Sequence, residues 1–312
     1  MKIDRYLLEL VPNEPSGLYK PVFDTLSAGG KRVRPILTAL AAGLTITNDA
    51  WLPAAAAVEL LHTFTLVHDD IMDNAATRRG QPTTHVRYGT NAAILSGDVL
   101  IALAQESLAR MNSQSLPNTI AEFGHAFRMV CEGQALDKEY ETRDNISTVE
   151  YLHMIDLKTS KVLELAAVFG ALAGGGTYVE ELRAFARHLG LAFQIGDDLL
   201  DLTANHSAFG KTIGGDILEG KRTMLFVTAM DHYSSLPANN RSLLDRIRDR
   251  RATPEDITPA RELFQSLGVL EAASEAAKNE TSKAKDALLR IPASTGRDRL
   301  DAFSDYLLER AS

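Results

Sequence analysis

The sequence predicts an all-α protein, a bundle built from many helices. Apolar residues recur at helical spacing through most of the 312 residues, and alternating, strand-like runs are scarce. The hydrophobic content of 45% is ample for a large core. No linker rich in Pro, Gly or Ser divides the chain, so we expect a single domain over residues 1–312.

The predicted helices follow one another along the whole chain. Asn48 and Asp49 are candidate caps for a helix that opens at Ala50, and Ser147 with Glu150 three residues later has the spacing of a capping box. The predicted helical ranges are 3–10, 19–27, 34–43, 50–73, 91–111, 117–141, 148–173, 178–203, 221–232, 239–250, 258–267, 269–291 and 295–310.

Charge and composition narrow the class of protein. A formal net charge of -8 argues against a nucleic-acid surface, so an acidic ligand would have to be met locally by clustered Lys, Arg and metal. The single cysteine, Cys131, cannot form an internal disulfide and is interpreted as a small core residue. The N-terminal stretch does not resemble a signal peptide, and no uninterrupted apolar run reaches membrane-spanning length. We expect a cytoplasmic protein with no transmembrane segment.

Two groups of three aspartates are the main chemical signal. Each has the pattern DDxxD at the end of an apolar helical run, in VELLHTFTLVHDDIMD and in FQIGDDLLD. Carboxylates about 5 Å apart repel by roughly 3 kcal/mol at an effective dielectric near 20, so each group must protonate or hold cations. Oxygen ligands select Mg²⁺ when phosphate shares its shell. The candidate metal ligands are Asp69, Asp70, Asp73, Asp197, Asp198 and Asp201.

A single DDxxD is typical of a solvated helix face, but the repetition favours two facing helices that grip one polyanion through shared metal ions. Basic residues in the predicted loops support this interpretation. AGGKRVRP contains Lys31, Arg32 and Arg34, although an ordinary basic turn has the same composition. Similar clusters, each with a surface role as the alternative, are Arg78 and Arg79 after the first DDxxD and Lys158 within a helix. Lys211 and Lys221 follow the second DDxxD, and this recurrence of acids followed by cations indicates two half-sites that close over phosphate.

Together and in this order, the motifs resemble the trans-isoprenyl diphosphate synthases, also called polyprenyl synthetases. The motifs are GGKRVRP, ELLHTFTLVHDDIMD, RRGQPTTH, NAAILSGDVL, LKTSK, FQIGDDLLD and GKTIGGDILEGKRT. The resemblance implies a helical bundle of isoprenoid synthase type around a central cavity, usually homodimeric. It also implies a prenyltransferase that uses Mg²⁺ to join isopentenyl diphosphate head to tail onto an allylic diphosphate, releasing pyrophosphate.

The resemblance assigns roles residue by residue. It implies that isopentenyl diphosphate is held by Lys31, Arg34, His62 and Arg79. It implies that Mg²⁺ is ligated by Asp69, Asp73 and Asp197, supported directly or through water by Asp70, Asp198 and Asp201. It implies that the allylic diphosphate is contacted by Arg78, Lys158, Lys211 and Lys221. Thr159 and Gln194 are implied to lie beside the developing allylic cation. Read alone, His62 would more often be a buried, satisfied histidine.

Product length depends on residues just before the first DDxxD. Phe64 lies where the family often places an aromatic to floor the cavity, Thr65 and Leu61 would leave space beside it, and DDIMD carries no insertion. This combination resembles geranylgeranyl diphosphate synthases, with farnesyl or longer polyprenyl diphosphates as the alternative products. On an ideal helix, however, Phe64 is about 140° from Asp69, which would suit simple core packing.

Three other functions remain as alternatives. A terpene cyclase shares the first aspartate motif but usually has a different second metal motif. A non-catalytic partner subunit commonly lacks the aspartates that this chain retains. A helical metal-binding scaffold without a reaction would leave the basic clusters unexplained.

Overall fold

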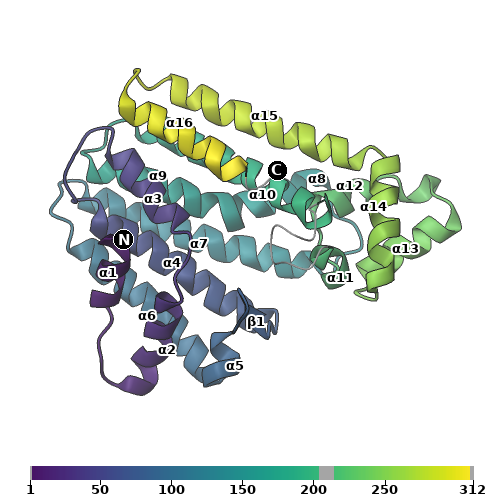
Figure 1. The fold of residues 1–312 in the computed structure, drawn as a ribbon, viewed down its shortest axis with the longest axis horizontal. Helices are drawn as coiled ribbons and strands as arrows, with labels where there is room; N and C mark the ends of the chain where they lie inside the picture. The colour runs from purple at the N-terminus through teal and green to yellow at the C-terminus, as the bar shows by residue number, and fades with distance from the viewer. Residues whose placement is uncertain (1, 204–213, 310–312) are drawn as a thin grey trace. The chain divides into compact units, whose positions relative to one another are not determined.

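The computed structural model describes residues 2–203 and 214–309, and it confirms the all-α prediction. Within these ranges the only strands are β1 (Thr77–Arg78) and β2 (Gln81–Pro82), which pair antiparallel as one small hairpin (Figure 1). The helices are α1 (Lys2–Glu9), α2 (Ser16–Ser27), α3 (Val33–Ala42), α4 (Leu52–Met72), α5 (Thr84–Tyr88), α6 (Thr90–Ala109), α7 (Leu116–Tyr140), α8 (Thr148–Ile155), α9 (Lys161–Ala173), α10 (Val179–Thr203), α11 (Gly215–Glu219), α12 (Met224–Met230), α13 (Ala238–Arg248), α14 (Ile257–Ser266), α15 (Val269–Leu289) and α16 (Thr295–Leu308).

The structure also contains a π-helix, η1 (Asp156–Ser160), and two short 3₁₀ turns, η2 (Tyr233–Ser235) and η3 (Pro254–Asp256). The prediction of one regular helix over 148–173 is therefore wrong, because η1 interrupts it. The π-turn adds a residue to the helical repeat and changes the direction of the side chains that follow it.

The chain groups into two compact units, each assembled from separate stretches. The first unit comprises Met1–Phe127, Val162–Arg183 and Ile291–Leu300, and the second comprises Arg128–Lys161, Ala184–Arg290 and Asp301–Ser312. The first aspartate group belongs to the first unit and the second aspartate group to the second. The single domain over 1–312, the central cavity and the facing of the two acidic helices all stay predictions.

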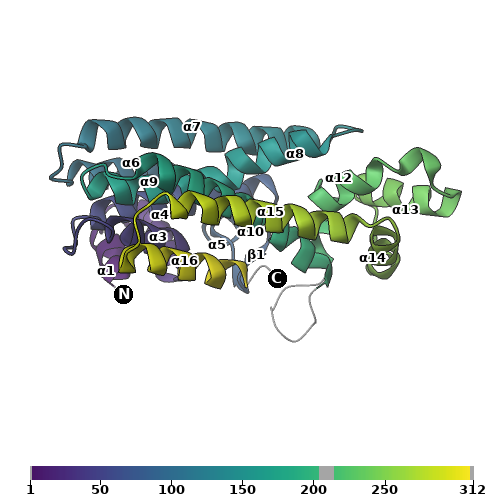
Figure 2. The same cartoon turned by 90° about the horizontal axis from the view of Figure 1, so that it is seen from above.

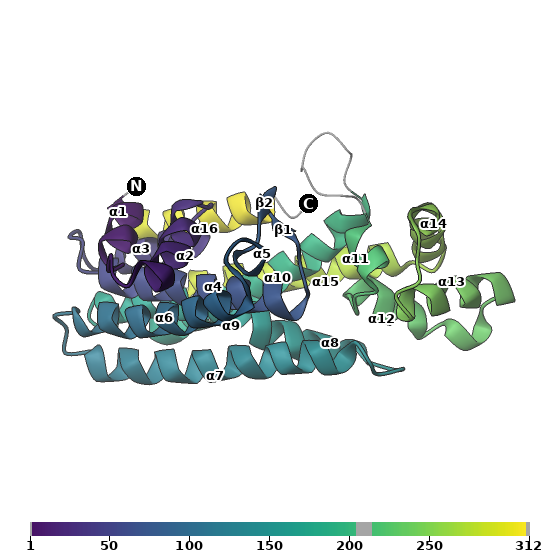
Figure 3. The same ribbon diagram turned by 90° about the horizontal axis from the view of Figure 1, so that it is seen from below.

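Helix α4 forms the centre of the first unit because its first turns are made of small apolar residues. Its segment from Ala54 to Ala57 is fully buried, and side chains of this size let other helices approach closely. Helix α6 lies alongside α4, and α1 and α3 also pack against it (Figures 1 and 3). The last turns of α4, which carry Asp69 and Asp70, therefore continue a firmly packed helix.

The second unit has its own apolar core, which includes Ile195, Phe226, Leu244 and Phe264. Helices α12 and α14 pack against α15, and α13 packs against α14, so these short helices gather at one end of α15 (Figure 2). Helix α8 packs against α12. Residues of α8 and α10 belong to this core, so it fixes α10, which carries Gln194 and the second aspartate group, and α8, which leads into η1.

The sequence located one helix start correctly and misplaced another. Ser147 and Glu150 form the predicted capping box at the start of α8, with the Ser147 amide donating to Glu150 Oε2 at 2.9 Å. Helix α4, however, begins at Leu52 rather than Ala50, and Trp51 precedes it without a side-chain cap. Asn48 Oδ1 instead accepts a hydrogen bond from the Ala50 amide in the preceding turn, at 3.1 Å.

Two further features correct or extend the sequence analysis. Cys131 is exposed on α7 rather than buried in the core. Helix α6 is long and apolar enough to cross a membrane by length and composition alone, although 44% of its apolar window is buried inside the structure. A buried core helix of a soluble protein meets the same criterion, so α6 carries little weight as a membrane span.

Candidate active site

The first aspartate group closes α4 in the first unit. Asp69 and Asp73 lie four residues apart and share a helix face, whereas Asp70 is turned inward and is only 4% exposed. Arg78 Nε donates to Asp70 Oδ1 at 2.7 Å, and Arg78 Nη2 lies 3.7 Å from Asp69 Oδ2. Burial raises the pKa of Asp70 above its ordinary value, although Arg78 acts in the opposite direction. Asp70 is thus tied to a protein cation inside its own unit.

The β1–β2 hairpin sends its two adjacent arginines to different partners. Arg79 and Gly80 form its two-residue turn, and both have a positive φ, of 53° and 74°. Arg78, on the strand, points to Asp70, whereas Arg79 Nη1 donates to the Gly29 carbonyl at 3.0 Å. A Cβ on Gly30 would lie 2.9 Å from Arg79 Nη1, so a side chain at this position would displace the end of the Arg79 guanidinium.

A cluster of cations surrounds His62 in the first unit. Burial and the charge of Arg79 lower the pKa of Arg34 to about 10, opposed by Glu59, so Arg34 remains charged at neutral pH. Burial, followed by the charges of Arg34 and Arg79, lowers the pKa of His62 well below its ordinary value and keeps its imidazole neutral. Arg34 Nε is buried without a hydrogen-bond partner among the described residues. The structure therefore brings three of the predicted isopentenyl diphosphate residues together. The fourth, Lys31, is exposed on the loop just before α3, the helix that carries Arg34.

Arg32 has a different role from the one that the sequence suggested. It was grouped with Lys31 and Arg34 as a cation for diphosphate, but it is only 6% exposed and its guanidinium is occupied by protein oxygens. Arg32 Nη1 donates to Glu59 Oε1 at 2.7 Å and Nη2 to the Leu26 carbonyl at 2.8 Å. A third bond, from Arg32 Nε to Asp4 Oδ1, measures 2.9 Å.

Sequence reasoning missed Glu59, which anchors this loop. The available signal was its position: it is an acid within the apolar run of α4, and a buried carboxylate requires a cationic partner. Arg32 adopts a left-handed φ of 48° in the loop before α3. Its ion pair with Glu59 helps to hold the loop in this shape.

The second aspartate group lies near the end of α10 in the second unit. Asp198 is 5% exposed and accepts hydrogen bonds from the Tyr151 hydroxyl, from Gln194 Nε2 at 3.1 Å and from the Met224 amide at 3.1 Å. Burial and the charge of Asp216 raise the pKa of Asp198 to about 7. Asp201 Oδ2 accepts a hydrogen bond from the Asp216 amide at 3.0 Å. These carboxylates help to join α8, α10, α11 and α12.

The π-helix η1 positions the predicted catalytic pair Lys158 and Thr159. Lys158 Nζ lies 2.7 Å from Asp137 Oδ2, and Thr159 Oγ1 donates to Gln194 Oε1 at 3.1 Å. Two glycines allow η1 to pack between α7 and α10. A Cβ on Gly133 would lie 2.5 Å from the Lys158 nitrogen, and one on Gly190 would lie 2.6 Å from the Ser160 Cα.

Of the two remaining predicted cations of the second unit, the structure describes Lys221, whereas Lys211 falls outside the described residues. Lys221 is exposed and its Nζ lies 2.8 Å from Glu219 Oε2 and 3.2 Å from Asp216 Oδ1. Although desolvation acts to lower it, these two carboxylates raise the pKa of Lys221 overall. The predicted contact of both lysines with an allylic diphosphate stays a prediction.

The donor chemistry of the aspartate groups suits Mg²⁺ that is also bound by phosphate. Over residues 2–203 and 214–309, no group of three or more His, Cys, Asp or Glu side chains is arranged to hold a metal ion by itself. Asp70 and Asp198 each accept a hydrogen bond within the protein. Mg²⁺ usually binds through one or two carboxylates plus substrate phosphate and water, so a complete protein cage is not required.

Comparison with known proteins shows which family this chain resembles over most of its length. A family model described as polyprenyl synthetase matches residues 15–264. Geranylgeranyl diphosphate synthase of Methanosarcina mazei is 36% identical, over 99% of this chain and 94% of its own, and geranylfarnesyl diphosphate synthase of Aeropyrum pernix is 35% identical, over 99% of both.

Solved structures give the same result for the fold. Geranylgeranyl pyrophosphate synthetase from Pyrococcus horikoshii superposes with a TM-score of 0.91 at 35% identity, covering 99% of this chain and 95% of its own. Polyprenyl synthase from Caulobacter crescentus, crystallised with calcium and isoprenyl diphosphate, has a TM-score of 0.89 at 33% identity, covering 100% and 94%.

Proposed function

Because this chain belongs to the polyprenyl synthetase family and is a trans-isoprenyl diphosphate synthase, we propose that its main product is geranylgeranyl diphosphate. The structural observation that carries the proposed mechanism is the cationic cluster around His62, which contains Arg34 and Arg79 and lies in the same unit as an acidic helix end. Several relatives are named geranylgeranyl diphosphate synthases, which supports this product length. A geranylfarnesyl synthase among the relatives keeps longer products as the alternative.

The cationic cluster of the first unit is proposed to hold isopentenyl diphosphate. Arg34 and Arg79 would supply positive charge, and neutral His62 would donate a hydrogen bond without adding to the repulsion between cations. Lys31, on the neighbouring loop, would contact the same diphosphate. The contacts of the Arg32 guanidinium with Glu59 and the Leu26 carbonyl would keep the loop in place when the anion binds.

The allylic diphosphate is proposed to bind between the aspartates and the second set of cations. Asp69, Asp73 and Asp197 would hold Mg²⁺, which when bound neutralises the diphosphate as it leaves. The cations proposed to contact this diphosphate are Arg78, Lys158, Lys211 and Lys221. The oxygens of Thr159 and Gln194 would face the allylic cation that forms as the bond to pyrophosphate breaks. The double bond of isopentenyl diphosphate then attacks this cation, and the new cation loses a proton to the departing pyrophosphate, which leaves a double bond in the product.

Product analysis tests the proposal directly. The purified chain is incubated with isopentenyl diphosphate and Mg²⁺, starting separately from dimethylallyl, geranyl and farnesyl diphosphates, and the products are separated by chromatography. Geranylgeranyl diphosphate as the dominant product from all three starters supports the proposal. Mainly farnesyl or longer products would overturn the assigned length. Hydrocarbon formed from the allylic substrate alone would instead favour cyclisation.

Phe64 is proposed to limit the product length. Its ring is half-buried and packs 4.5 Å from the His68 ring and edge-on to Phe127, with ring centroids 5.3 Å apart. Thr65 is half-buried beside it, whereas Leu61 is fully buried and is therefore less able to leave space for a growing chain. Phe64→Ala removes the ring and is expected to shift the products to longer chains, measured by chromatography. The control is Phe303→Leu, which changes a buried aromatic residue of the second unit and should leave the product length unchanged. An unchanged distribution in Phe64→Ala would show that Phe64 serves only the core.

A homodimer is proposed through the outer side of α6. This helix packs on α4 but leaves the adjacent Ile94 41% and Leu95 53% exposed, and a second copy of the chain would bury these two side chains. Light scattering of the purified chain is expected to give the mass of two copies, and Leu95→Glu is expected to reduce it towards one. Val149→Glu, at an apolar residue that is 76% exposed on α8, should leave the mass unchanged. A monomeric wild-type chain would contradict the proposal.

We also propose that the enzyme works in the cytoplasm.

A further inference from the structure

The buried environment of Asp198 suggests a task other than metal binding. A carboxylate has about four acceptor positions. Three donors already occupy positions on Asp198: the Tyr151 hydroxyl and the Met224 amide on Oδ2, and Gln194 Nε2 on Oδ1. A carboxylate surrounded in this way is well suited to orient a neighbouring group.

The neighbouring group is the side-chain amide of Gln194. It lies four residues before Asp198 on α10, and its Nε2 donates to Asp198 Oδ1 at 3.1 Å. Its Oε1 accepts from Thr159 Oγ1 at 3.1 Å. With Asp198 ionised, the reverse amide orientation would place Oε1 against a carboxylate oxygen, and two acceptors repel. Asp198 therefore determines that the carbonyl oxygen of Gln194 points towards Thr159.

Asp198 is in turn held by Tyr151 of α8. Tyr151 is 2% exposed, so its ring is fixed by the surrounding core, and its hydroxyl donates to Asp198 Oδ2, whereas Gln194 donates to Oδ1. The three contacts form a continuous series, Tyr151–Asp198–Gln194–Thr159, which joins α8, α10 and η1 within the second unit.

We propose that Tyr151 is a positioning residue: through Asp198 it fixes the Gln194 amide so that its carbonyl oxygen, with the Thr159 hydroxyl, faces the carbon from which pyrophosphate departs. This inference rests on the proposed function. The negative end of a fixed amide dipole stabilises positive charge that develops only in the transition state, so the contact affects kcat rather than substrate binding.

The test is the steady-state kinetics of Tyr151→Phe in the full-length enzyme. Phenylalanine keeps the ring but removes the hydroxyl. We expect kcat to fall about 10- to 100-fold, as for the loss of a hydrogen bond to a charged group. The KM for isopentenyl diphosphate and the Mg²⁺ concentration that gives half-maximal activity should remain unchanged. Asp198→Asn should lower kcat at least as much, because its amide can also donate to Gln194 Oε1 and permit the reversed orientation.

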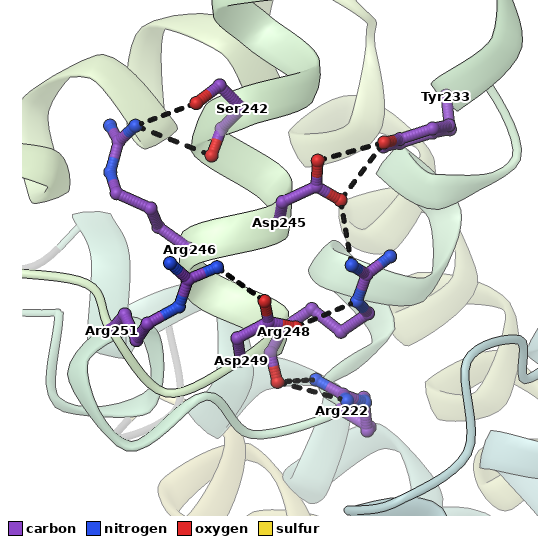
Figure 4. A network of polar contacts seen from close by, with 8 residues as sticks. All are labelled: Arg222, Tyr233, Ser242, Asp245, Arg246, Arg248, Asp249 and Arg251. Atoms are coloured by element: carbon purple, nitrogen blue, oxygen red, sulfur yellow. Dashed lines mark hydrogen bonds and ion pairs between the residues drawn. The ribbon is translucent and has the colours of Figure 1, made fainter.

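Tyr233→Phe is the matched control for a purely structural loss. The Tyr233 hydroxyl likewise donates to a carboxylate, that of Asp245, at 2.9 Å, within the network of Figure 4 and in the same unit. This variant removes a bond of the same kind without touching Gln194. Similar changes in melting temperature in both variants, with kcat lowered only in Tyr151→Phe, support positioning.

Several results would overturn the inference. An unchanged kcat in Tyr151→Phe, or an equal loss in Tyr233→Phe, would leave Tyr151 with a structural role only. A raised Mg²⁺ requirement at unchanged kcat would assign Asp198 to the metal instead. If Tyr151→Phe does not fold, Asp198→Asn provides the test instead. A lower kcat at an unchanged Mg²⁺ requirement in that variant supports positioning, and an unchanged kcat overturns it. A wild-type enzyme that forms no prenyl diphosphate would refute the proposed function itself, which is a different outcome.

Discussion

Replacing Asp69 with asparagine is expected to lower kcat/KM by about 10²- to 10³-fold, the effect of losing several kcal/mol of charge stabilisation. Asparagine keeps the shape and one oxygen but removes the charge that would hold Mg²⁺ at the end of α4. Arg78 Nη2 lies 3.7 Å from Asp69 Oδ2, so this change disturbs the fold less than removing the more deeply buried Asp70 would. Activity should be measured across a Mg²⁺ titration, where the half-maximal concentration should rise.

Asp49→Asn is the control for this prediction. Asp49 is also in the first unit, but it is exposed and pairs with exposed Lys2, at 2.7 Å, and such surface pairs contribute little stability. Its variant should keep wild-type kinetics. A chelator should abolish activity in the wild type, and added Mg²⁺ should restore it. Unchanged kinetics in Asp69→Asn, or full activity in the chelator, would contradict the proposed role of the metal.

The second large effect is expected from either glycine beside η1. An added Cβ in Gly133→Ala would meet the Lys158 nitrogen at 2.5 Å, and in Gly190→Ala it would meet the Ser160 Cα at 2.6 Å. Both contacts are with backbone atoms of η1, which cannot rotate away as a side chain could, so η1 must shift. Because a displacement of about 1 Å can cost roughly 10²-fold in rate, kcat should fall by that order in each variant. Single-turnover kinetics would locate the loss in the chemical step.

Gly124→Ala separates this steric effect from a general change in helix propensity. Gly124 lies in α7, like Gly133, but a Cβ there would meet nothing within 4 Å. Alanine at an open helical position is expected to stabilise the protein by about 0.5–1 kcal/mol, and kcat should not change. Equal activity of all three variants would mean that the place of η1 does not determine the rate.

The acidic and basic clusters were predictable from the sequence because their chemistry is carried by residue type and spacing. Asp69 and Asp73 share a face on any helix, and the Ser147 capping box depends on neighbours three residues apart. The inward orientation of Asp198 was not predictable in this way. It depends on Tyr151 and Met224, which are distant in sequence and reach Asp198 only through packing of α8 and α12.

The π-helix illustrates the same limit. The apolar periodicity over 148–173 is compatible with one regular helix, and nothing local marks η1. Its place depends on close contact with Gly133 and Gly190, which belong to two other helices. The opposite error occurred at Arg32, whose sequence neighbours suggested a ligand-binding cation. Its partners are the buried Glu59, the partly exposed Asp4 and the Leu26 carbonyl, which come from three separate helices.

The tight turn of the β1–β2 hairpin has a consequence for how the two substrates influence each other. Arg78 and Arg79 are consecutive residues joined to different elements, one to Asp70 and the other to the Gly29 carbonyl. If each arginine serves a different diphosphate, as proposed, drawing one of them towards its ligand displaces the other. The affinities for the two substrates would then be thermodynamically linked, so that each changes the dissociation constant of the other by the same factor in either order of addition.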